Sequence, residues 1–465
     1  GGDSGSNSSF DSIVAIGGNI GAIGGSDATN KKDIFYVNNS WIESRLDFKV
    51  EGVGYSNVEE RIFNNLGCNF IHSISSIGAG STTEDPSIGK YEENSSNFYD
   101  IYNNIAIGDY SNSKIYLGGG GQSGYSGGTK TNIVSRSVYS SGRNTYGQLG
   151  RIINTGYDTI PMQITETIDN SNIVAISAGG SHSLFLDENG NVYSCGKDSY
   201  GQLGRTTDNT KIPLQITETI DNSNIVAISA GGSHSLFLDE NGNVYSCGKD
   251  SYGQLGRTTD NTKIPLQITE TIDNSNIVAI SAGGEHSLFL DENGNVYSCG
   301  RNNYGQLGHG NINNYNFPAI IDALNGSNIV AISAGRSHSL FLDETGNVYS
   351  CGWNSYNQLG RIINTGYDNI PKQITDTIGT STIVAICTGA YHSLFLHENG
   401  NVYSCGRNDN GELGRTGDSR TPKQITDTIG NSNIVAISAG IQHSLFLDEN
   451  GNVYSCGRNN YGQLG

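Results

Sequence analysis

The alternation of apolar and polar residues within one stretch of the chain predicts four short β-strands. Ile173–Ser177 is a β-branched run bounded by glycine, which is typical of a buried strand. Ser183–Leu186 and Asn191–Cys195 follow, separated by Asp187–Gly190, whose Asn-Gly pair supplies the positive φ angles of a tight hairpin. A fourth strand is expected around Pro213–Thr217, where proline suits an edge strand that leaves one row of N–H groups unpaired.

This pattern repeats along the chain. The segment His-Ser-Leu-Phe-Leu begins six times at intervals of 51 to 54 residues, at His182, His234, His286, His338, His392 and His443. Each copy also carries Asn-Val-Tyr-Ser-Cys-Gly and then Tyr-Gly-Gln-Leu-Gly or a close variant, and residues 181–232 and 233–284 are identical. Four strands in each copy of this length are the signature of a propeller blade.

Three motifs of the repeat identify a family. Ala-Gly-x-x-His-Ser-Leu, Gly-Asn-Val-Tyr and Gly-x-Asn-x-Tyr-Gly-Gln-Leu-Gly resemble the regulator of chromosome condensation repeat. The resemblance covers roughly residues 103–465. It implies an all-β fold, a seven-bladed β-propeller of four-stranded blades.

The first blade, about residues 103–160, is degenerate, and six near-identical repeats follow it to residue 465. Val138–Gly142 matches the third strand of the other copies, but Lys114–Leu117 and Thr131–Val134 stand where His-Ser-Leu-Phe-Leu is missing. The last copy stops before its fourth strand. We therefore expect Asn104–Gly108 to pair with the last blade and close the ring, since an unpaired strand edge invites aggregation.

Residues 1–102 are expected to form a separate, Gly-rich and β-rich accessory region with one short helix near 57–66. Ser56–Glu59 has the form of a capping box that opens a helix, and Gly67 would end it. Arg45–Glu51 alternates polar and apolar residues, which predicts a half-buried strand. Asp11–Ile16 resembles one blade strand.

Composition and charge exclude several classes of protein. The hydrophobic share of 35%, with 64 glycines added, reaches a globular value and excludes disorder throughout. No apolar run approaches the roughly 18 residues of a membrane helix, so membrane insertion is not expected. The net charge of −19 repels phosphate backbones and anionic headgroups, so we expect no nucleic-acid binding.

The repeated histidines and carboxylates do not predict an enzyme, a cofactor or a metal. A His-Ser pair with a nearby acid suggests a nucleophile and its base, but catalysis needs one asymmetric pocket and these pairs recur around a ring. We expect the six histidines to be structural, with the imidazole bonded to backbone on inner strands. Asp187–Asn191 spaces oxygen ligands as a calcium loop does, yet it lacks a bidentate Glu, and His397 replaces the Asp in one copy.

Eight cysteines bear on the redox compartment. Six occupy one equivalent strand position, too far apart on neighbouring blades for disulfides, and we expect them to pack as buried side chains: Cys195, Cys247, Cys299, Cys351, Cys405 and Cys456. Cys387 precedes Cys405 in the same blade, so a bond between these two stays open, and Cys68 has no evident partner. Free thiols favour a reducing compartment.

Binding specificity is expected where the copies differ. The loop before the histidine is Gly-Gly-Ser in two copies and carries Glu285, Arg336, Tyr391 or Gln442 in the other four. The position after the Cys-Gly pair is Lys or Arg in five copies, Arg407 among them, and Trp353 in one. Tyr, Trp and Arg are the residue types that anchor interfaces, so these six are the candidate partner-binding residues. The alternative is drift on exposed loops.

These observations favour a non-enzymatic structural or interaction protein that binds a protein partner or assembles with itself. The Gly-rich first region, the missing Met, the abrupt C-terminus and four Asn-x-Ser sequons, beginning at Asn7, Asn38, Asn94 and Asn325, suggest part of an exported surface, fibre or appendage subunit. Its location would then be extracellular or on a particle surface.

The family resemblance implies alternatives. One is a cytoplasmic, partner-binding propeller such as a nucleotide-exchange factor for a small GTPase, and another is a secreted enzyme inhibitor. A light-sensing branch of the family uses a cluster of tryptophans. This chain has only Trp41 and Trp353, which argues against light sensing.

Overall fold

The computed structural model describes residues 137–465, with short gaps at 169–170, 207–208, 221–222, 259, 273–274, 377 and 379–381, together with the backbone of the strands between Ser9 and Gly108. The chain divides into two compact units. One contains residues 63–70, 99–108 and 135–465, and the other contains residues 1–62, 71–98 and 109–134.

The repeat folds into a four-stranded antiparallel sheet, as the pattern predicts. In its first full copy the strands are β10 (Ile173–Ala178), β11 (His182–Asp187), β12 (Val192–Gly196) and β13 (Thr210–Gln215), in that spatial order. Gly190 in the hairpin between β11 and β12 has a φ of +80°, the conformation expected of Asn-Gly. Pro213 lies in the outermost strand β13, where the missing N–H leaves no sheet bond unmade.

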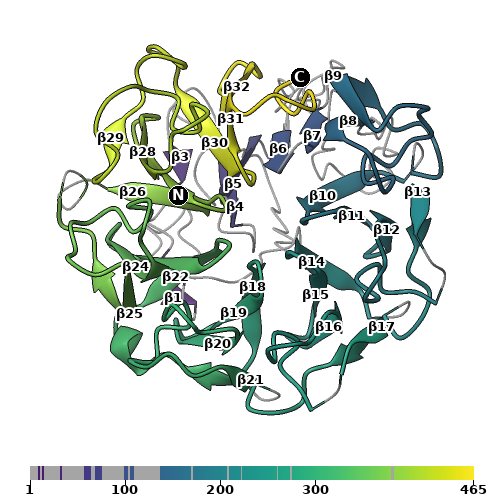
Figure 1. Cartoon of the computed structure of the whole chain (residues 1–465), viewed down its shortest axis with the longest axis horizontal. Helices are drawn as coiled ribbons and strands as arrows, with labels where there is room; N and C mark the ends of the chain where they lie inside the picture. Colours follow the sequence, from purple (N-terminus) through teal and green to yellow (C-terminus); the bar gives the residue numbers. More distant parts are fainter. Residues whose placement is uncertain are drawn as a thin grey trace, which may run out of the picture. The chain divides into compact units, whose positions relative to one another are not determined.

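Four more sheets of the same order follow it around a common centre (Figure 1). Their strands are β14 (Ile225–Ala230), β15 (His234–Asp239), β16 (Val244–Gly248) and β17 (Thr262–Gln267); β18 (Ile277–Ala282), β19 (His286–Asp291), β20 (Val296–Gly300) and β21 (Tyr315–Ile320); β22 (Ile329–Ala334), β23 (His338–Asp343), β24 (Val348–Trp353) and β25 (Tyr367–Gln373); and β26 (Ile383–Thr388), β27 (His392–His397), β28 (Val402–Gly406) and β29 (Lys423–Gln424). One short 3₁₀ helix, η2 (Asp322–Leu324), follows β21.

The first sheet corrects the expected closure of the ring. It consists of β6 (Tyr99–Tyr102), β7 (Ile105–Gly108), β8 (Ser137–Arg143) and β9 (Tyr157–Gln163). β7 pairs with β8 in the first sheet, so the prediction that Asn104–Gly108 pairs with the last blade is wrong. The reason is that β7 pairs with β8 and so forms the second strand of the first sheet, the strand that His-Ser-Leu-Phe-Leu forms in the other copies. Lys114–Leu117 and Thr131–Val134 lie outside the described residues.

The last sheet has three strands, β30 (Ile434–Ala439), β31 (His443–Asp448) and β32 (Val453–Gly457). The structure therefore confirms an all-β propeller of four-stranded blades. Among the described residues six blades have four strands, so the prediction of seven four-stranded blades is wrong, because the last sheet has three strands. Its sequence includes the Tyr-Gly-Gln-Leu-Gly bend and no counterpart of the outer strand β13. In consequence Val453 is 44% exposed, whereas Val192 is 2% exposed.

The core lies between neighbouring sheets. Its largest side chains are the phenylalanines of the repeated strand, all with no exposed surface: Phe185, Phe237, Phe289, Phe341, Phe395 and Phe446. Burial of each such side chain contributes about 1.5–3 kcal/mol. Phe185 packs with Ile173 and Ile176 of its own sheet, and the other copies repeat this arrangement.

Histidines and serines connect the sheets near the centre. His182 Nε2 lies 2.9 Å from Ser235 Oγ of the next sheet, and the serine in turn donates to the Gln202 carbonyl at 2.7 Å. The same bond recurs from His234, His286, His338 and His392. We call the six histidines and the five serines the inner histidine ring; among the described residues, His443 Nε2 has no hydrogen-bond partner. The expected partner of the imidazole was backbone, and it is instead the neighbouring serine.

The strands before residue 99 form two small sheets. β1 (Ser9–Phe10) pairs with β2 (Ile13–Val14), and β3 (Lys32–Asp33), β4 (Asn57–Phe63) and β5 (Asn69–Ser75) form the other. The predicted helix near 57–66 is wrong because this segment is β4. A capping box is a local preference, and sheet pairing with β-branched Val58 and Ile62 overrides it. Arg45–Glu51 lies outside the described residues.

Within the described part of the chain, no helix has the length and apolar character that a bilayer crossing requires.

Candidate functional site

Two loops of each sheet meet at the end of the strands where the histidines lie. The residue after the last Gly of the third strand donates its backbone N–H to the loop that precedes the histidine: Lys197 to Ser181 at 2.9 Å, Trp353 to Ser337 at 2.8 Å and Arg407 to Tyr391 at 2.9 Å. Gly196 has a φ of +109°, and a Cβ there would lie 2.6 Å from the Ser181 carbonyl oxygen. Glycine is therefore required for the two variable positions to lie side by side.

Tyrosines and cations alternate across neighbouring sheets at this end. Lys197 lies 5.1 Å from the ring centroid of Tyr146, and Arg301 lies 5.1 Å from that of Tyr252. The same arrangement joins last and first sheets, because Arg143 lies 5.5 Å from the ring centroid of Tyr461. We call this the tyrosine–cation ladder, formed by Tyr146, Tyr200, Tyr252, Tyr304, Tyr356 and Tyr461 with Arg143, Lys197, Lys249, Arg301, Trp353, Arg407 and Arg458.

One position of the ladder carries Trp353 in place of a cation. Its ring stacks on Tyr304 at 5.4 Å and meets Tyr356 and Tyr391 edge-on at 5.5 and 5.6 Å. The guanidinium of Arg407 lies 5.2 Å from the Tyr356 centroid, and the exposed Arg336 donates to the Tyr391 hydroxyl. We call these six residues the tryptophan cluster. It is amphipathic and partly exposed, which is the character of an interface anchor.

The neighbouring sector of the ladder contains an acid. Glu285 Oε1 lies 2.8 Å from Lys249 Nζ, and its Oε2 lies 2.6 Å from Arg301 Nη1. Partial burial raises the pKa of Glu285, but the hydrogen bonds and charges of these two cations outweigh it and leave the pKa below its usual value. Further around, Gln442 Oε1 accepts a hydrogen bond from Arg458 Nη1 at 2.7 Å.

All six candidate partner-binding residues therefore lie at this one end of the sheets, five in loops and Trp353 as the last residue of β24. The structure brings Arg336, Trp353, Tyr391 and Arg407 together in the tryptophan cluster, and it places Glu285 and Gln442 in separate sectors.

Comparison with known proteins identifies the family. A model of the RCC1-like domain matches residues 122–381, and models of the regulator of chromosome condensation (RCC1) repeat match residues 383–412, 399–447 and 434–463. The first match alone spans more than half of the chain. The chain belongs to the RCC1-repeat family.

Relatives of this RCC1-repeat chain include the human E3 ubiquitin-protein ligase HERC2, 31% identical over 71% of this chain, and the ultraviolet-B receptor UVR8 of Arabidopsis thaliana, 32% identical over 63%. The matched region is 7% of HERC2 and 67% of UVR8. Among solved structures, Prp20p of Saccharomyces cerevisiae is 26% identical, with a TM-score of 0.62, over 70% of this chain and 82% of that chain. Prp20p binds Gsp1p and histones.

The inner histidine ring lacks the features of a catalytic pair. Burial lowers the pKa of His182 to about 3, and it lowers the pKa of each of the other five histidines to about 3 or 4. The serine hydroxyl donates its hydrogen to a backbone carbonyl, as Ser235 does to Gln202. Both groups are fully buried, so no substrate reaches them.

The turn carboxylates and the thiols are also engaged in the fold. Asp187 Oδ1 accepts hydrogen bonds from the backbone N–H groups of Asn189 and Asn191 at 2.9 Å. The carboxylate therefore stabilises the hairpin turn rather than serving as a calcium ligand. Across the described residues, no group of three or more His, Cys, Asp or Glu side chains is placed to hold a metal ion. The seven cysteines in this part of the chain are free, including Cys387, and burial raises the pKa of Cys195 to about 12. Cys68 lies outside the described residues.

Sequence reasoning missed the tyrosines of the ladder and most of its cations. Tyr304 and Tyr356 belong to Tyr-Gly-Gln-Leu-Gly and its variant. The role of this motif in the bend already accounts for its recurrence, so the sequence does not mark the tyrosines as binding residues. The signal that was available is the recurrence of Lys or Arg after five of the six Cys-Gly pairs. The sequence does not display that Lys197, Arg301 and Arg407 each lie over a tyrosine of the preceding sheet.

Proposed function

We propose that this chain is a protein-binding propeller and that its partner docks on the tyrosine–cation ladder, anchored at the tryptophan cluster. The observation that carries the proposal is the gathering of Trp353, Tyr391, Arg336 and Arg407 in one partly exposed group, at the positions where otherwise repetitive copies differ. Aromatic residues and arginine dominate the binding energy of interfaces.

The charge of the ladder indicates the chemistry of the partner. Six of its seven non-tyrosine positions are Lys or Arg, in a chain whose net charge is −19. Complementary potentials steer association, so the partner surface would be acidic. Self-assembly through this end would instead bring like charges together, which disfavours it.

We further propose a location inside the cell rather than the exported surface or fibre subunit expected above. The relatives support this better, since ubiquitin ligases, a light receptor and Prp20p are not surface or fibre subunits. Seven free cysteines are compatible with a reducing compartment. A binding role rather than catalysis fits the buried, low-pKa histidines, and the chain matches only a small part of the HERC2 ligase.

We also infer a ring of seven blades, in which β30–β32 form the seventh. The boundary of the accessory region, expected at residue 102, would lie before β6, because β6 is a strand of the first sheet. Gly462 of the last sheet packs against Asp158 and Thr159 of β9, as Gly201 packs against Thr262 and Lys263 of β17. This repetition supports closure by packing of the bend on the next outer strand.

A second candidate function is nucleotide exchange on a small GTPase, favoured by the 26% identity to Prp20p, which binds Gsp1p. The assay is release of labelled GDP from purified small GTPases. Acceleration by the wild-type chain and recovery of a nucleotide-free GTPase would support it, whereas an unchanged release rate would exclude it for the GTPases tested.

The binding proposal is tested by capture on the immobilised intact chain followed by affinity measurement with the recovered partner. Trp353→Ala and Tyr391→Ala should each weaken binding about 30-fold or more, the size of an interface hot spot. Glu398→Gln, an exposed change at a hairpin turn on the opposite end of the strands, is the matched control and should bind as the wild type does. Equal affinity of all four proteins would refute the docking face.

A further inference from the structure

One position of the repeat, directly after the Tyr-Gly-Gln-Leu-Gly bend or its variant, carries a different residue in the sheet β18–β21. The residue after the Tyr-Gly-Gln-Leu-Gly bend or its variant is arginine in five sheets, namely Arg151, Arg205, Arg257, Arg361 and Arg415. In each, Nε donates to the hydroxyl of the strand serine at 3.0–3.1 Å, and Nη2 donates to the same serine's carbonyl at 2.6–2.8 Å. The guanidinium thus fills a fixed place beside the third strand.

In the sheet β18–β21 this residue is His309, which reproduces one of the two bonds. Its Nε2 lies 2.9 Å from Ser298 Oγ, and because that hydroxyl donates to the Leu307 carbonyl at 2.8 Å, the imidazole is the donor. Burial lowers the pKa of His309 below its usual value, so the ring is neutral at pH 7.

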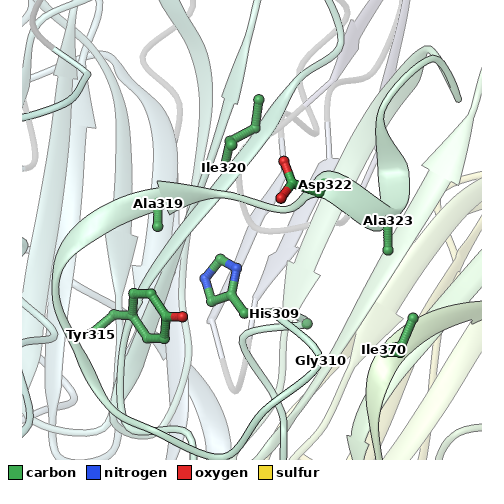
Figure 2. A pocket seen from close by; sticks show the side chains of 9 residues that line it. His309, Gly310, Tyr315, Ala319, Ile320, Asp322, Ala323 and Ile370 are labelled. Atoms are coloured by element: carbon green, nitrogen blue, oxygen red, sulfur yellow. The ribbon is translucent and has the colours of Figure 1, made fainter.

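A cavity of about 420 Å³ opens beside His309, between the outer strands β21 and β25. Figure 2 shows the Tyr315 ring and the Asp322 carboxylate on either side of the imidazole, with Ile320 and Ile370 on the walls. Tyr315 occupies the register position that Asp158 or Asp368 holds in two other sheets, where that acid pairs with its own arginine. Among the described residues Asp322 has no ion-pair partner, so its charge remains available.

We propose that this cavity binds the side chain of an arginine presented by a partner protein. A guanidinium is planar and stacks on aromatic rings, and Tyr315 and His309 offer such faces with centroids 4.4 Å apart. Its N–H groups would donate to the Asp322 carboxylate, which lines the cavity. An ammonium lacks the planar fork, so lysine would fit less well. This site is distinct from the tyrosine–cation ladder and does not depend on the function proposed for it.

The test is a calorimetric titration of the intact chain with N-acetyl-arginine amide and with an arginine-containing peptide. We expect saturable binding of both, with N-acetyl-lysine amide about tenfold weaker. Asp322→Asn should weaken arginine binding about tenfold, which corresponds to about 1.4 kcal/mol for a lost charge-assisted bond.

His309→Arg is the matched variant, because five sheets of the same chain already hold arginine at this position and the protein should remain folded. It places the chain's own guanidinium in the cavity, and arginine binding should be lost. Unchanged binding by His309→Arg, or equal affinity for the lysine analogue, would overturn the proposal. If free arginine or agmatine binds more tightly than the peptide, the ligand is a free guanidino compound and the protein-partner part is overturned.

Discussion

The inner histidine ring and the tyrosine–cation ladder both join neighbouring sheets. The residues of the ring are the same in every repeat, whereas those of the ladder vary from repeat to repeat. The ring keeps His and Ser in all six repeats, with every histidine at most 4% exposed. The ladder exchanges Lys, Arg and Trp, and its loops exchange Ser, Glu, Arg, Tyr and Gln. In five repeats the buried imidazole bonds to the serine of the next sheet, so these positions admit one pair of residues. A surface contact contributes little, so the ladder is free to specialise.

The largest expected effect separates the two regions by pH. Buried histidines with pKa values of about 3 to 4 bind fewer protons in the folded state than in the unfolded state, where the pKa is about 6.5. Stability is therefore complete above about pH 6.5 and falls as the pH drops toward 3, by about 1.4 kcal/mol per unit and histidine. Denaturant unfolding between pH 7 and 5 measures this.

A free energy of unfolding that stays constant from pH 7 to pH 5 in the wild type would contradict the burial of the ring.

A middle-sized effect distinguishes positions within the ring. Ser393 Oγ holds His338 Nε2 at 3.1 Å and also donates to Gln358, whereas Ser183 Oγ has one described bond, to Gln148. Ser393→Ala leaves a buried imidazole nitrogen without a partner, and it should lower the free energy of unfolding by about 1–3 kcal/mol more than Ser183→Ala does. Chemical denaturation of the two variants compares them directly, and equal losses would mean that the inter-sheet bond contributes nothing.

The smallest effect belongs to the ladder. Glu285→Gln removes its ion pairs with Lys249 and Arg301, all of which are 22–29% exposed, so the loss of stability should stay below about 1 kcal/mol. Because the pKa of Glu285 lies below its usual value, this contribution is present at neutral pH and disappears as the carboxylate is protonated in acid. The difference in melting temperature between Glu285→Gln and the wild type should shrink as the salt concentration rises. A loss of stability as large as that of Ser393→Ala would contradict the contrast between the ring and the ladder.

The sequence predicted the repeated sheet because its signals are local. Asn-Gly at residues 189–190 dictates the hairpin, and β-branched Ile173–Ile176 dictates a buried strand, whatever lies further along the chain. Where a segment could instead pair with a strand of a sheet, the local signal gave the wrong prediction. The capping box at Ser56 did not produce a helix in β4, and Asn104–Gly108 joined the first sheet because its register with β8 was available.

The candidate site divides in the same way. The copies' differences alone pointed to Trp353, Tyr391 and Arg407, since variation within a repeat is visible in the letters. The tertiary structure decided that these side chains form one cluster and that Lys197 lies over Tyr146.

By itself, then, the sequence determined the strands, the turns and the family, which depend on spacing within about 50 residues. The tertiary structure decided the partner of each histidine, the ladder and the cavity at His309. These arise between side chains on different sheets, and near-identical copies carry no label of which neighbour each will meet. Packing of one sheet against the next supplies that information.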